Sequence, residues 1–375
     1  MVTSTENKKF LKMALDLADK VKGNTSPNPS VGAILVKDNR IIGEGATQKA
    51  GEDHAEVVAI KKAGDNVAGS TLYVTLEPCC IQGKTPPCTD LIIEKKIKNV
   101  VVGSLDPNPK VNGNGISTLK KAGIKVEYGF MEKEINELNE DFAKFIKTKT
   151  PFCIAKYAMT LDGKIATFKG DSKWISNEKS RNFVHKLRNR VDGIMVGVNT
   201  IIYDNPKLTV RLDNKFKNPI RIVLDSHGRT PINSNVLQDD VETIFVLKKN
   251  STFYREQKEK FIEVCLKQGK KVIFDDTEGN KINIKNIIKE LGKLDITSIL
   301  IEGGSELLAS ALVERIIDKI ICFIAPKIVL GKEGTFPFGG IGFEKIEDAF
   351  LLDKIIPTQI GNDIMINGYV KYESN

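Results

Sequence analysis

The sequence has no long hydrophobic run, no internal repeat and no low-complexity tract. No apolar segment approaches the ~18 residues that a membrane-spanning helix needs, so we expect no membrane partner. Hydrophobic residues make up 41% and charged residues 28% of the chain, a globular composition that excludes a fibrous protein and wholesale disorder. Lys12, Asp16 and Asp19 interrupt the apolar face of residues 10–21, which predicts an amphipathic helix instead of a signal peptide, and a cytoplasmic protein.

A strongly basic surface is missing from the first part of the chain. Residues 1–146 contain 20 Lys and Arg against 19 Asp and Glu, so almost none of the net charge of +8 lies there. This balance argues against a nucleic-acid partner, which a basic patch would attract. Residues 147–375 contain 36 basic and 29 acidic side chains. That excess suits a phosphate-bearing ligand, and a solvated lysine-rich face would carry the same charge.

The length of 375 residues predicts two domains, and both read as α/β. The helical pattern breaks at Lys147-Thr148-Lys149-Thr150-Pro151, so we predict domains at 1–146 and 151–375. In the first we expect strands at 33–37, 40–43, 71–76, 99–103 and 124–128, and helices at 10–21, 54–63, 87–93, 116–122 and 132–145. In the second we expect strands at 152–159, 193–198, 220–224, 243–247, 271–274, 298–302 and 319–325, and helices at 178–190, 252–268, 284–292 and 305–316.

Cysteines are few, and half of them lie close together. Cys79, Cys80 and Cys88 fall within ten residues, and without a secretion signal this crowding favours metal ligation over disulfides. His54, Cys79 and Cys88 supply one imidazole and two thiolates, a set that leaves one position of a tetrahedral zinc ion open for water. A helix that begins at Pro87-Cys88 would favour deprotonation of a nearby thiol through its dipole.

Glu56 follows His54 by two residues, near the predicted metal without being forced to bind it. Zinc-bound water loses a proton near neutral pH, and Glu56 can take that proton and return it to a leaving amine. His-x-Glu followed by Pro-Cys is the signature of zinc deaminases. The alternative is a closed structural site with Cys80 as the fourth ligand, but adjacent cysteines point differently on an ordered backbone.

Eight residues separate Cys79 from Cys88, whereas nucleic-acid deaminases usually have Cys-x-x-Cys. Together with Pro27-Asn28-Pro29-Ser30-Val31-Gly32 and Asp106-Pro107-Asn108-Pro109, this segment resembles the bifunctional riboflavin-biosynthesis deaminase–reductases. The second half resembles the same family in four stretches: residues 156–164, Trp174-Ile175-Ser176, residues 204–211 and Glu302-Gly303-Gly304. The resemblance covers nearly the whole chain.

The resemblance implies an N-terminal cytidine-deaminase-like three-layer domain and a C-terminal dihydrofolate-reductase-like domain. The first domain would use zinc to deaminate 2,5-diamino-6-ribosylamino-4(3H)-pyrimidinone 5′-phosphate. The second would use NADPH to reduce the ribosyl group, giving 5-amino-6-ribitylamino-uracil 5′-phosphate. Family members also suggest a homo-oligomer.

The resemblance also assigns residues. In the deaminase domain, His54, Cys79 and Cys88 would bind zinc, Glu56 would transfer protons, and Asn28, Asp106 and Asn108 would line the substrate pocket. In the reductase domain, NADPH would contact Ala158, Trp174, Thr200, Asp204, Gly303, Gly304 and Ser305. The substrate or its phosphate would contact Lys156, Ser172, Arg188, Leu208, Arg211 and Glu302.

Several of these residues have a structural explanation as well. Asparagine is common in Asn-Pro turns, arginines commonly form surface ion pairs, and Trp174, the only tryptophan, would also suit a core. No Gly-x-Gly-x-x-Gly follows the first strand of the second domain, which disfavours a Rossmann-type dinucleotide fold. Gly303-Gly304 before a helix would let backbone amides approach a phosphate, and by itself it is also typical of a tight turn.

One position departs from the family. A histidine usually stands two residues after the first zinc cysteine, where this chain has Ile81, and Cys80 replaces the usual serine. Gln82 or Lys84 would have to hold substrate instead, and weaker deamination is one consequence. Three other functions stay open: a nucleic-acid-editing zinc deaminase with an unrelated appended domain, a zinc-stabilised ligand sensor, and a chain with one working half.

Overall fold

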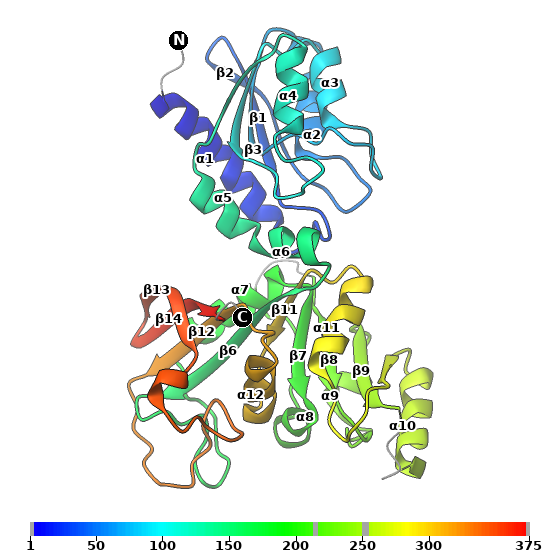
Figure 1. Cartoon of the computed structure of the whole chain (residues 1–375), viewed down its shortest axis with the longest axis vertical. Coiled ribbons are helices and arrows are strands. Elements are labelled where there is room, and N and C mark those ends of the chain that lie inside the picture. Colours follow the sequence, from blue (N-terminus) through cyan, green and yellow to red (C-terminus); the bar gives the residue numbers. More distant parts are fainter. Residues whose placement is uncertain (1–3, 213–216, 250–254, 373–375) are drawn as a thin grey trace. The chain divides into compact units, whose positions relative to one another are not determined.

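The structure is a computed structural model that describes residues 4–212, 217–249 and 255–372. The chain divides into two compact units, Met1–Lys149 and Thr150–Asn375. We call them the first and the second unit and describe each by itself (Figure 1).

The first unit is built on a five-stranded sheet, as far as its described residues show, in the order β2-β1-β3-β4-β5. Its strands are β1 (Gly32–Lys37), β2 (Arg40–Ala46), β3 (Thr71–Leu76), β4 (Asn99–Ser104) and β5 (Lys125–Tyr128). β1 pairs antiparallel with β2 and β3, and β3, β4 and β5 are parallel. The β1–β2 turn uses Asp38 and Asn39, both with positive φ, as a two-residue hairpin requires.

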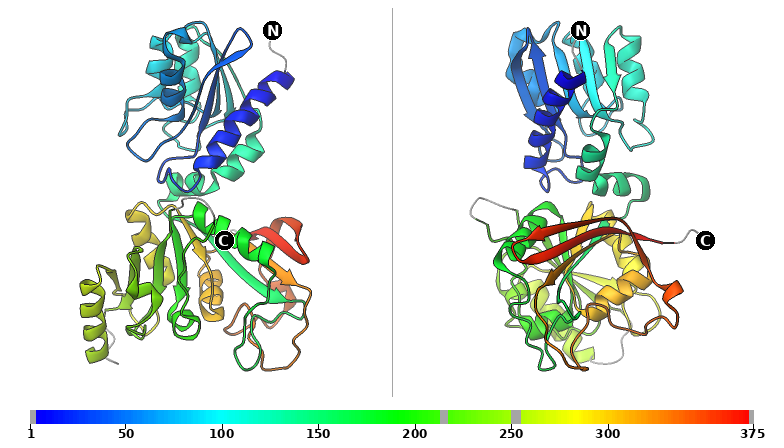
Figure 2. Two further views of the ribbon diagram at one scale, coloured as in Figure 1. Left: turned by 180° about the vertical axis from the view of Figure 1, so that it is seen from behind. Right: turned by 90° about the vertical axis from the view of Figure 1, so that its left-hand side faces the viewer.

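Helices cover both faces of this sheet (Figures 1 and 2). The helices are α1 (Ser4–Val21), α2 (Ala55–Ala63), η1 (Gly64–Val67), α3 (Cys88–Glu94), α4 (Asn114–Lys121), α5 (Glu132–Leu138) and α6 (Glu140–Thr148). On one face α1 packs Leu11 and Ala14 against Ile34 and Tyr73. On the other, α2, α3 and α4 bury a larger apolar cluster against the alternate residues of β1, β3 and β4. The unit therefore has three layers.

The helix expected over 132–145 is interrupted at Asn139. The Asn139 side chain is buried and bonds the backbone of Ser30 twice, accepting from its N–H at 2.8 Å and donating to its C=O at 3.0 Å. These bonds fix the chain where α5 ends and α6 begins. The prediction of one continuous helix was wrong because this partner lies more than 100 residues away in the sequence.

The second unit contains a nine-stranded sheet in its described part, in the order β10-β9-β8-β7-β11-β6-β12-β14-β13. Its strands are β6 (Phe152–Thr160), β7 (Gly193–Gly197), β8 (Ile220–Leu224), β9 (Thr243–Lys248), β10 (Lys271–Asp275), β11 (Ser298–Ile301), β12 (Lys319–Ala325), β13 (Leu351–Ile360) and β14 (Asp363–Lys371). Neighbours from β10 to β12 are parallel, and β14 and β13 are antiparallel. Continuous apolar runs match the buried parallel strands.

Helices again lie on both faces of the second sheet (Figure 2). They are α7 (Glu178–Arg190), α8 (Val198–Asp204), α9 (Asn235–Gln238), α10 (Arg255–Lys267), α11 (Ile284–Lys293), α12 (Ser305–Val313) and the short η2 (Ile346–Asp348). α11 and α12 share one buried cluster, and α9 and α10 pack into another on the opposite face. The start of the helix expected at 252–268 lies outside the described residues.

The hairpin of β13 and β14 was not predicted from the sequence. Most side chains of β13 are exposed, so burial imposes no apolar–polar alternation, and β13 contains Pro357, a residue that is unfavourable in a central strand. The structure places this strand at the sheet edge, where proline is tolerated.

Candidate active sites

Three predicted metal ligands converge in the first unit. His54 precedes α2, Cys79 follows β3, and Cys88 is the first residue of α3. His54 Nδ1 lies 3.6 Å from the sulfur of Cys79 and 3.4 Å from that of Cys88. All three ligand atoms lie within 4.8 Å of one another. This donor set fits a zinc ion with one position left open.

The sulfur of Cys79 is stabilised as a thiolate. The Cys88 backbone N–H, at the start of α3, donates to this sulfur at 3.3 Å. A donor at a helix N-terminus favours the deprotonated form of a thiol, as predicted from the sequence. A hydrogen bond from the Cys88 thiol, aided by His54, lowers the pKa of Cys79 to about 4. Among the described residues Cys80 does not join the metal-ligand group, so the closed four-ligand alternative finds no support in the geometry.

Glu56 lies in the first turn of α2 and is only 4% exposed. Burial and, to a lesser extent, the charge of the nearby Cys79 sulfur raise the pKa of Glu56 to about 7. A carboxyl group with a pKa near neutrality can both accept and release a proton. Glu56 lies beside the ligand group without belonging to it, which is the arrangement that proton transfer needs.

Thr85 holds the far side of the His54 ring and was not predicted. His54 Nε2 lies 3.4 Å from Thr85 Oγ1, and with Nδ1 on a metal ion Nε2 would carry the proton and donate to that hydroxyl. Partners of this kind fix the orientation of a metal-binding imidazole. No sequence signal distinguishes Thr85 from an ordinary loop threonine.

We expect Thr85→Val to weaken zinc binding by about tenfold, because the imidazole loses the acceptor that orients it. Thr85→Ser keeps the hydroxyl and should bind zinc as the wild type does. Titration against a competing zinc chelator measures both affinities. Equal affinities for the valine and serine variants would show that this contact does not matter.

The predicted pyrimidine-pocket residues lie on two loops. Asn28 closes a turn in which its backbone N–H donates to the Thr25 carbonyl. Asp106 follows β4 and is 6% exposed, and its carboxylate accepts from the backbone N–H of Asn108 at 2.8 Å. Burial raises the pKa of Asp106 to about 6, with smaller contributions from the charges of Glu77 and Cys79.

The loop between the two zinc cysteines carries the departure from the family. Ile81 is half-buried, and Gln82 and Lys84 are exposed. Gln82 donates weakly to the carbonyl oxygens of Gly83 and Thr85, at 3.4 and 3.5 Å. Lys84 forms no ion pair with any described residue, so of the two predicted substitutes for the histidine it is the one left available for a ligand.

A cavity of about 330 Å³ in the second unit brings most of the predicted reductase residues together. Eleven of them line it: Lys156, Ala158, Ser172, Trp174, Arg188, Thr200, Asp204, Arg211, Glu302, Gly303 and Gly304. Two do not. Ser305 begins α12 just behind the glycine turn, and Leu208 is 3% exposed in the apolar cluster of α9 and α10, so its side chain is directed into the core.

The floor of this cavity is a buried ion cluster. Arg188 binds Glu302 with two parallel hydrogen bonds of 2.6 and 2.9 Å, and Lys156 Nζ lies 3.1 Å from the same carboxylate. Burial would raise the pKa of Glu302, but Lys156 and Arg188 outweigh it and hold the pKa well below its usual range. The Arg188 guanidinium, which we expected to contact the substrate or its phosphate, is engaged by Glu302.

Arg211 and His185 lie beside this cluster. Among the described residues Arg211 forms no ion pair, so its guanidinium is available to an anionic ligand. His185 was not predicted: its Nδ1 accepts from the Arg211 backbone N–H at 3.3 Å. Burial, with Arg188 and Arg211, lowers the pKa of His185 to about 4, so the ring is neutral at physiological pH.

Trp174 and the glycine turn frame the rest of the cavity. Trp174 is 62% exposed, with the Arg181 guanidinium 4.7 Å from its ring centre, so the core-packing interpretation is wrong. Gly303 has φ +107°, which a residue with a side chain rarely adopts. Gly304 is the N-cap residue of α12 and lines the cavity, and its N–H donates to Thr200 Oγ1 at 3.3 Å, so the N-terminus of a helix, which favours a phosphate, lies at the cavity wall.

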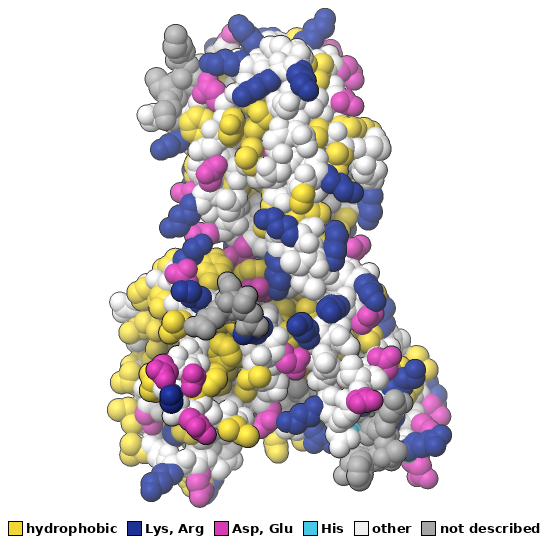
Figure 3. Space-filling view, in the orientation of Figure 1, with side chains coloured by type: hydrophobic (Ala, Val, Ile, Leu, Met, Phe, Trp, Pro, Cys, Tyr) yellow, Lys and Arg dark blue, Asp and Glu magenta, His cyan; other side chains and the backbone are white. Residues whose placement is uncertain are grey.

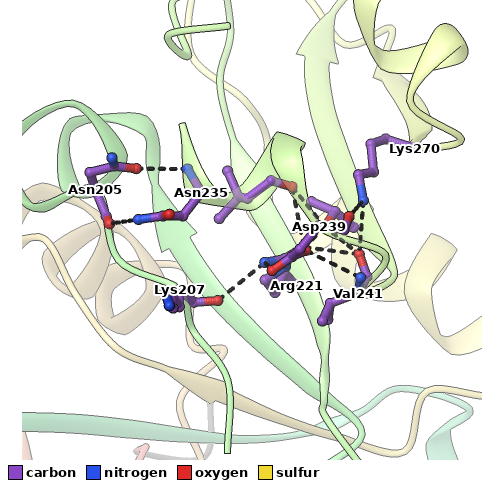
Figure 4. Close-up of polar contacts among 9 residues, drawn as sticks. Asn205, Lys207, Arg221, Asn235, Asp239, Val241 and Lys270 are labelled. Carbon is purple, nitrogen blue, oxygen red and sulfur yellow. Dashed lines mark hydrogen bonds and ion pairs between the residues drawn. The ribbon is translucent and has the colours of Figure 1, made fainter. Parts of the chain in front are cut away.

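A buried arginine anchors the loop that carries Asp204 and Arg211 (Figure 4). Arg221 of β8 is fully buried, pairs with Asp239, and donates to the backbone carbonyl of Lys207 at 3.1 Å. Asn235 binds the backbone and side-chain oxygens of Asn205 at 2.6 and 2.8 Å. These contacts fix the middle of the loop between its two cavity-lining residues.

We expect Arg221→Met to destabilise the second unit by about 3 kcal/mol, because several carbonyl oxygens lose a buried donor at once. Thermal or urea unfolding measures the loss. Arg255→Met is the matched control, since Arg255 forms an exposed pair with Glu259 on α10 and should change stability by less than about 0.5 kcal/mol. Equal losses in the two variants would contradict this account.

No helix formed by the described residues combines the length and the apolar character that crossing a membrane requires.

Residues 4–104 match the family described as the cytidine and deoxycytidylate deaminase zinc-binding region, and residues 151–366 match the RibD C-terminal domain family. These matches confirm the predicted fold class, a deaminase-like α/β unit followed by an α/β reductase unit.

Relatives match along nearly the whole chain. The riboflavin biosynthesis protein RibD of Aquifex aeolicus is 44% identical over 361 residues, which cover 96% of this chain and 97% of that protein. RibD of Escherichia coli is 37% identical, and the match covers 91% of this chain and 93% of that protein.

Two solved structures also match. One is the Thermotoga maritima diaminohydroxyphosphoribosylaminopyrimidine deaminase/5-amino-6-(5-phosphoribosylamino)uracil reductase. It has a TM-score of 0.82 at 36% identity, and the match covers 97% of this chain and 99% of that chain. Acinetobacter baumannii RibD has a TM-score of 0.84 at 34% identity, with 98% and 99% covered. The chain therefore belongs to the family of bifunctional riboflavin-biosynthesis deaminase–reductases, and both the deaminase and the reductase half are present in it.

Proposed function

We propose that the chain catalyses two consecutive reactions on one phosphorylated pyrimidine. The first is the hydrolytic deamination of 2,5-diamino-6-ribosylamino-4(3H)-pyrimidinone 5′-phosphate with release of ammonia. The second is the NADPH-dependent reduction of the ribosyl group, giving 5-amino-6-ribitylamino-uracil 5′-phosphate. The observation that carries the proposal is the convergence of His54, Cys79 and Cys88 beside buried Glu56. The printed name of the Thermotoga relative supports the same pair of reactions.

Zinc is the metal that the first site would hold, through His54, Cys79 and Cys88. Bound zinc lowers the pKa of a coordinated water and so supplies a nucleophile near neutral pH. Glu56 accepts the proton of the attacking water and delivers it to the departing amino group, and its raised pKa suits both steps. Asn28, Asp106 and Asn108 orient the pyrimidine and its ribose phosphate.

NADPH is the reductant that the second site would hold. Ala158, Trp174, Thr200 and Asp204 line the same cavity as the Gly303-Gly304 turn, which fits a dinucleotide whose phosphate lies against that turn and Ser305. NADPH supplies the hydride for C1′ of the opened ribose. Arg211 binds the substrate phosphate, Ser172 and Lys156 contact the sugar, and Glu302 holds Lys156 and Arg188 in place. Leu208 does not line the cavity, and its buried side chain instead anchors the loop between Asp204 and Arg211 to the core.

The experiment supplies the diamino-pyrimidine phosphate with and without NADPH and follows ammonia release and NADPH oxidation together. The proposal expects ammonia in both cases and NADPH oxidation that depends on prior deamination. Ammonia release without NADPH oxidation would indicate that only the first half is active. The absence of both signals would favour the zinc-stabilised sensor. RNA or DNA deamination would revive the editing-enzyme alternative, which the family membership does not favour.

We further propose that the partner of each site is this small molecule, without nucleic acid, and that the chain forms a homo-oligomer in the cytoplasm. Figure 3 supports the oligomer, because hydrophobic side chains gather where β13 and β14 lie. Leu351, Ile355, Ile356 and Ile364 are each 47–62% exposed there, a pattern typical of an interaction surface. Free thiols at all six cysteines suit a reducing compartment. A monomer in sedimentation equilibrium would contradict the oligomer.

A further inference from the structure

Glu77 is a buried carboxylate that no described cation pairs with. It follows β3 directly, and its residue is 3% exposed. Its oxygens accept three backbone N–H bonds, from Asp106 at 3.2 Å, Gly113 at 2.9 Å and Ile116 at 3.1 Å. A buried charge is tolerated only when it is paired or well hydrogen-bonded, and here backbone amides satisfy it.

Two of these amides belong to the N-terminus of α4. Gly113 is the N-cap residue of that helix, and no side chain of its own caps it. The first N–H groups of a helix need an acceptor, and a negative charge there is favoured by the helix dipole. Glu77, from another part of the chain, supplies both the hydrogen-bond acceptor and the negative charge. The approach is close: a Cβ added at Gly115 would lie 2.3 Å from the Pro78 carbonyl oxygen and 3.1 Å from Glu77 Oε1.

The third amide belongs to the loop that carries the proposed pyrimidine-pocket residues. Glu77 accepts from the backbone of Asp106, and the Asp106 carboxylate in turn accepts from the backbone of Asn108. Cys79 stands two residues after Glu77 in the sequence. One side chain therefore joins the segment of the metal ligand to the segment of the substrate residues.

We propose that Glu77 is a positioning residue of the deaminase: its carboxylate sets the distance between the metal centre and the loop of Asp106 and Asn108. This inference rests on the proposed function of these two residues. It assigns Glu77 no contact with substrate and no proton transfer. Its effect is to keep the substrate-binding loop in register with Cys79, so its loss should weaken substrate binding more than turnover.

The test is Glu77→Gln in the full chain, with Glu94→Gln, an exposed residue at the end of α3, as the control. The amide keeps the size of the side chain but replaces one acceptor by a donor that faces backbone N–H groups. Hydrogen bonds to a charged group are strong enough that we expect KM for the pyrimidine to rise about tenfold, with kcat changed less than about threefold. Zinc content and the reductase rate should match the control.

Hydrogen–deuterium exchange gives a second readout that does not depend on activity. The peptide covering residues 105–116 should exchange about tenfold faster in Glu77→Gln, while β1 stays protected. Gly115→Ala is the second variant, because its Cβ would push α4 away from Pro78 and Glu77 while leaving the Glu77 side chain and the proposed metal and substrate residues unchanged in identity. We expect it to raise KM in the same direction, although alanine favours a helix more than glycine does.

The outcomes separate the two proposals. A wild-type chain that releases no ammonia overturns the proposed function, and exchange in residues 105–116 still tests the contacts of Glu77. With an active wild type, unchanged KM and unchanged exchange in both variants overturn the role of Glu77. Faster exchange throughout the first unit, or a loss of kcat with KM unchanged, overturns it as well.

Discussion

Glu56→Gln should abolish deamination while leaving zinc binding and reduction intact. The glutamine has the same size but can neither accept the proton of water nor return one to the leaving amine. Removing a general acid–base group costs about 10²–10⁴-fold in rate. Ammonia release, zinc content and NADPH oxidation on the already deaminated substrate measure the three properties separately.

Glu52→Gln is the control for this variant, since Glu52 is an exposed carboxylate four residues earlier. It should release ammonia at the wild-type rate. If Glu56→Gln retained zinc and deaminated as fast as this control, the proton-transfer role would have to be given to another residue.

Glu302→Gln should abolish reduction and destabilise the second unit. The side chains of Glu302, Arg188 and Lys156 are 6%, 11% and 15% exposed, so a neutral amide leaves two buried cations side by side without a counter-charge. Breaking a buried ion pair from one side costs about 3 kcal/mol or more. Ammonia release should continue, and the deaminated intermediate should accumulate with NADPH unused.

The difference in unfolding free energy between the wild type and Glu302→Gln should also depend on pH. The pKa of the Glu302 carboxyl is lower in the folded chain than its ordinary value, so its contribution is complete above that ordinary pKa and is lost as the pH falls toward the folded-state pKa. Unfolding of wild type and variant should therefore differ at neutral pH and converge in acid. Glu306→Gln, at an exposed position of α12, is the control, and an equal effect there would contradict the role of the ion cluster.

The sequence predicted that His54, Cys79 and Cys88 converge because the chemistry of this candidate metal site is local. His54 and Glu56 lie in one turn, and Cys79 and Cys88 lie at the two ends of one short loop, so the residue types and their spacing already restrict the geometry. Thr85 and Glu77 were missed because their partners are chosen by the fold. A threonine in a loop or a glutamate after a strand carries no signal of the imidazole or the helix end that it meets.

The reductase site shows the same limit. Arg188 on α7 and Glu302, which directly follows β11, are 114 positions apart and form the bidentate pair, so only the fold brings them together. The sequence therefore singled out both residues for contact with the substrate or its phosphate, but it carried no signal that they pair with each other. The exposure of the Trp174 ring and the hairpin of β13 and β14 could not be predicted from apolar patterns. Side chains that face solvent show no apolar–polar pattern that burial would impose.

X-ray absorption at the zinc edge of the purified chain tests the central claim most directly. The account predicts one zinc ion per chain with two sulfur neighbours, one imidazole nitrogen and one light atom from solvent, and loss of one sulfur in Cys88→Ser. A shell of three sulfurs and one nitrogen, with Cys80 in the fourth position, would contradict it, because such a closed site leaves no place for the water that Glu56 is proposed to deprotonate.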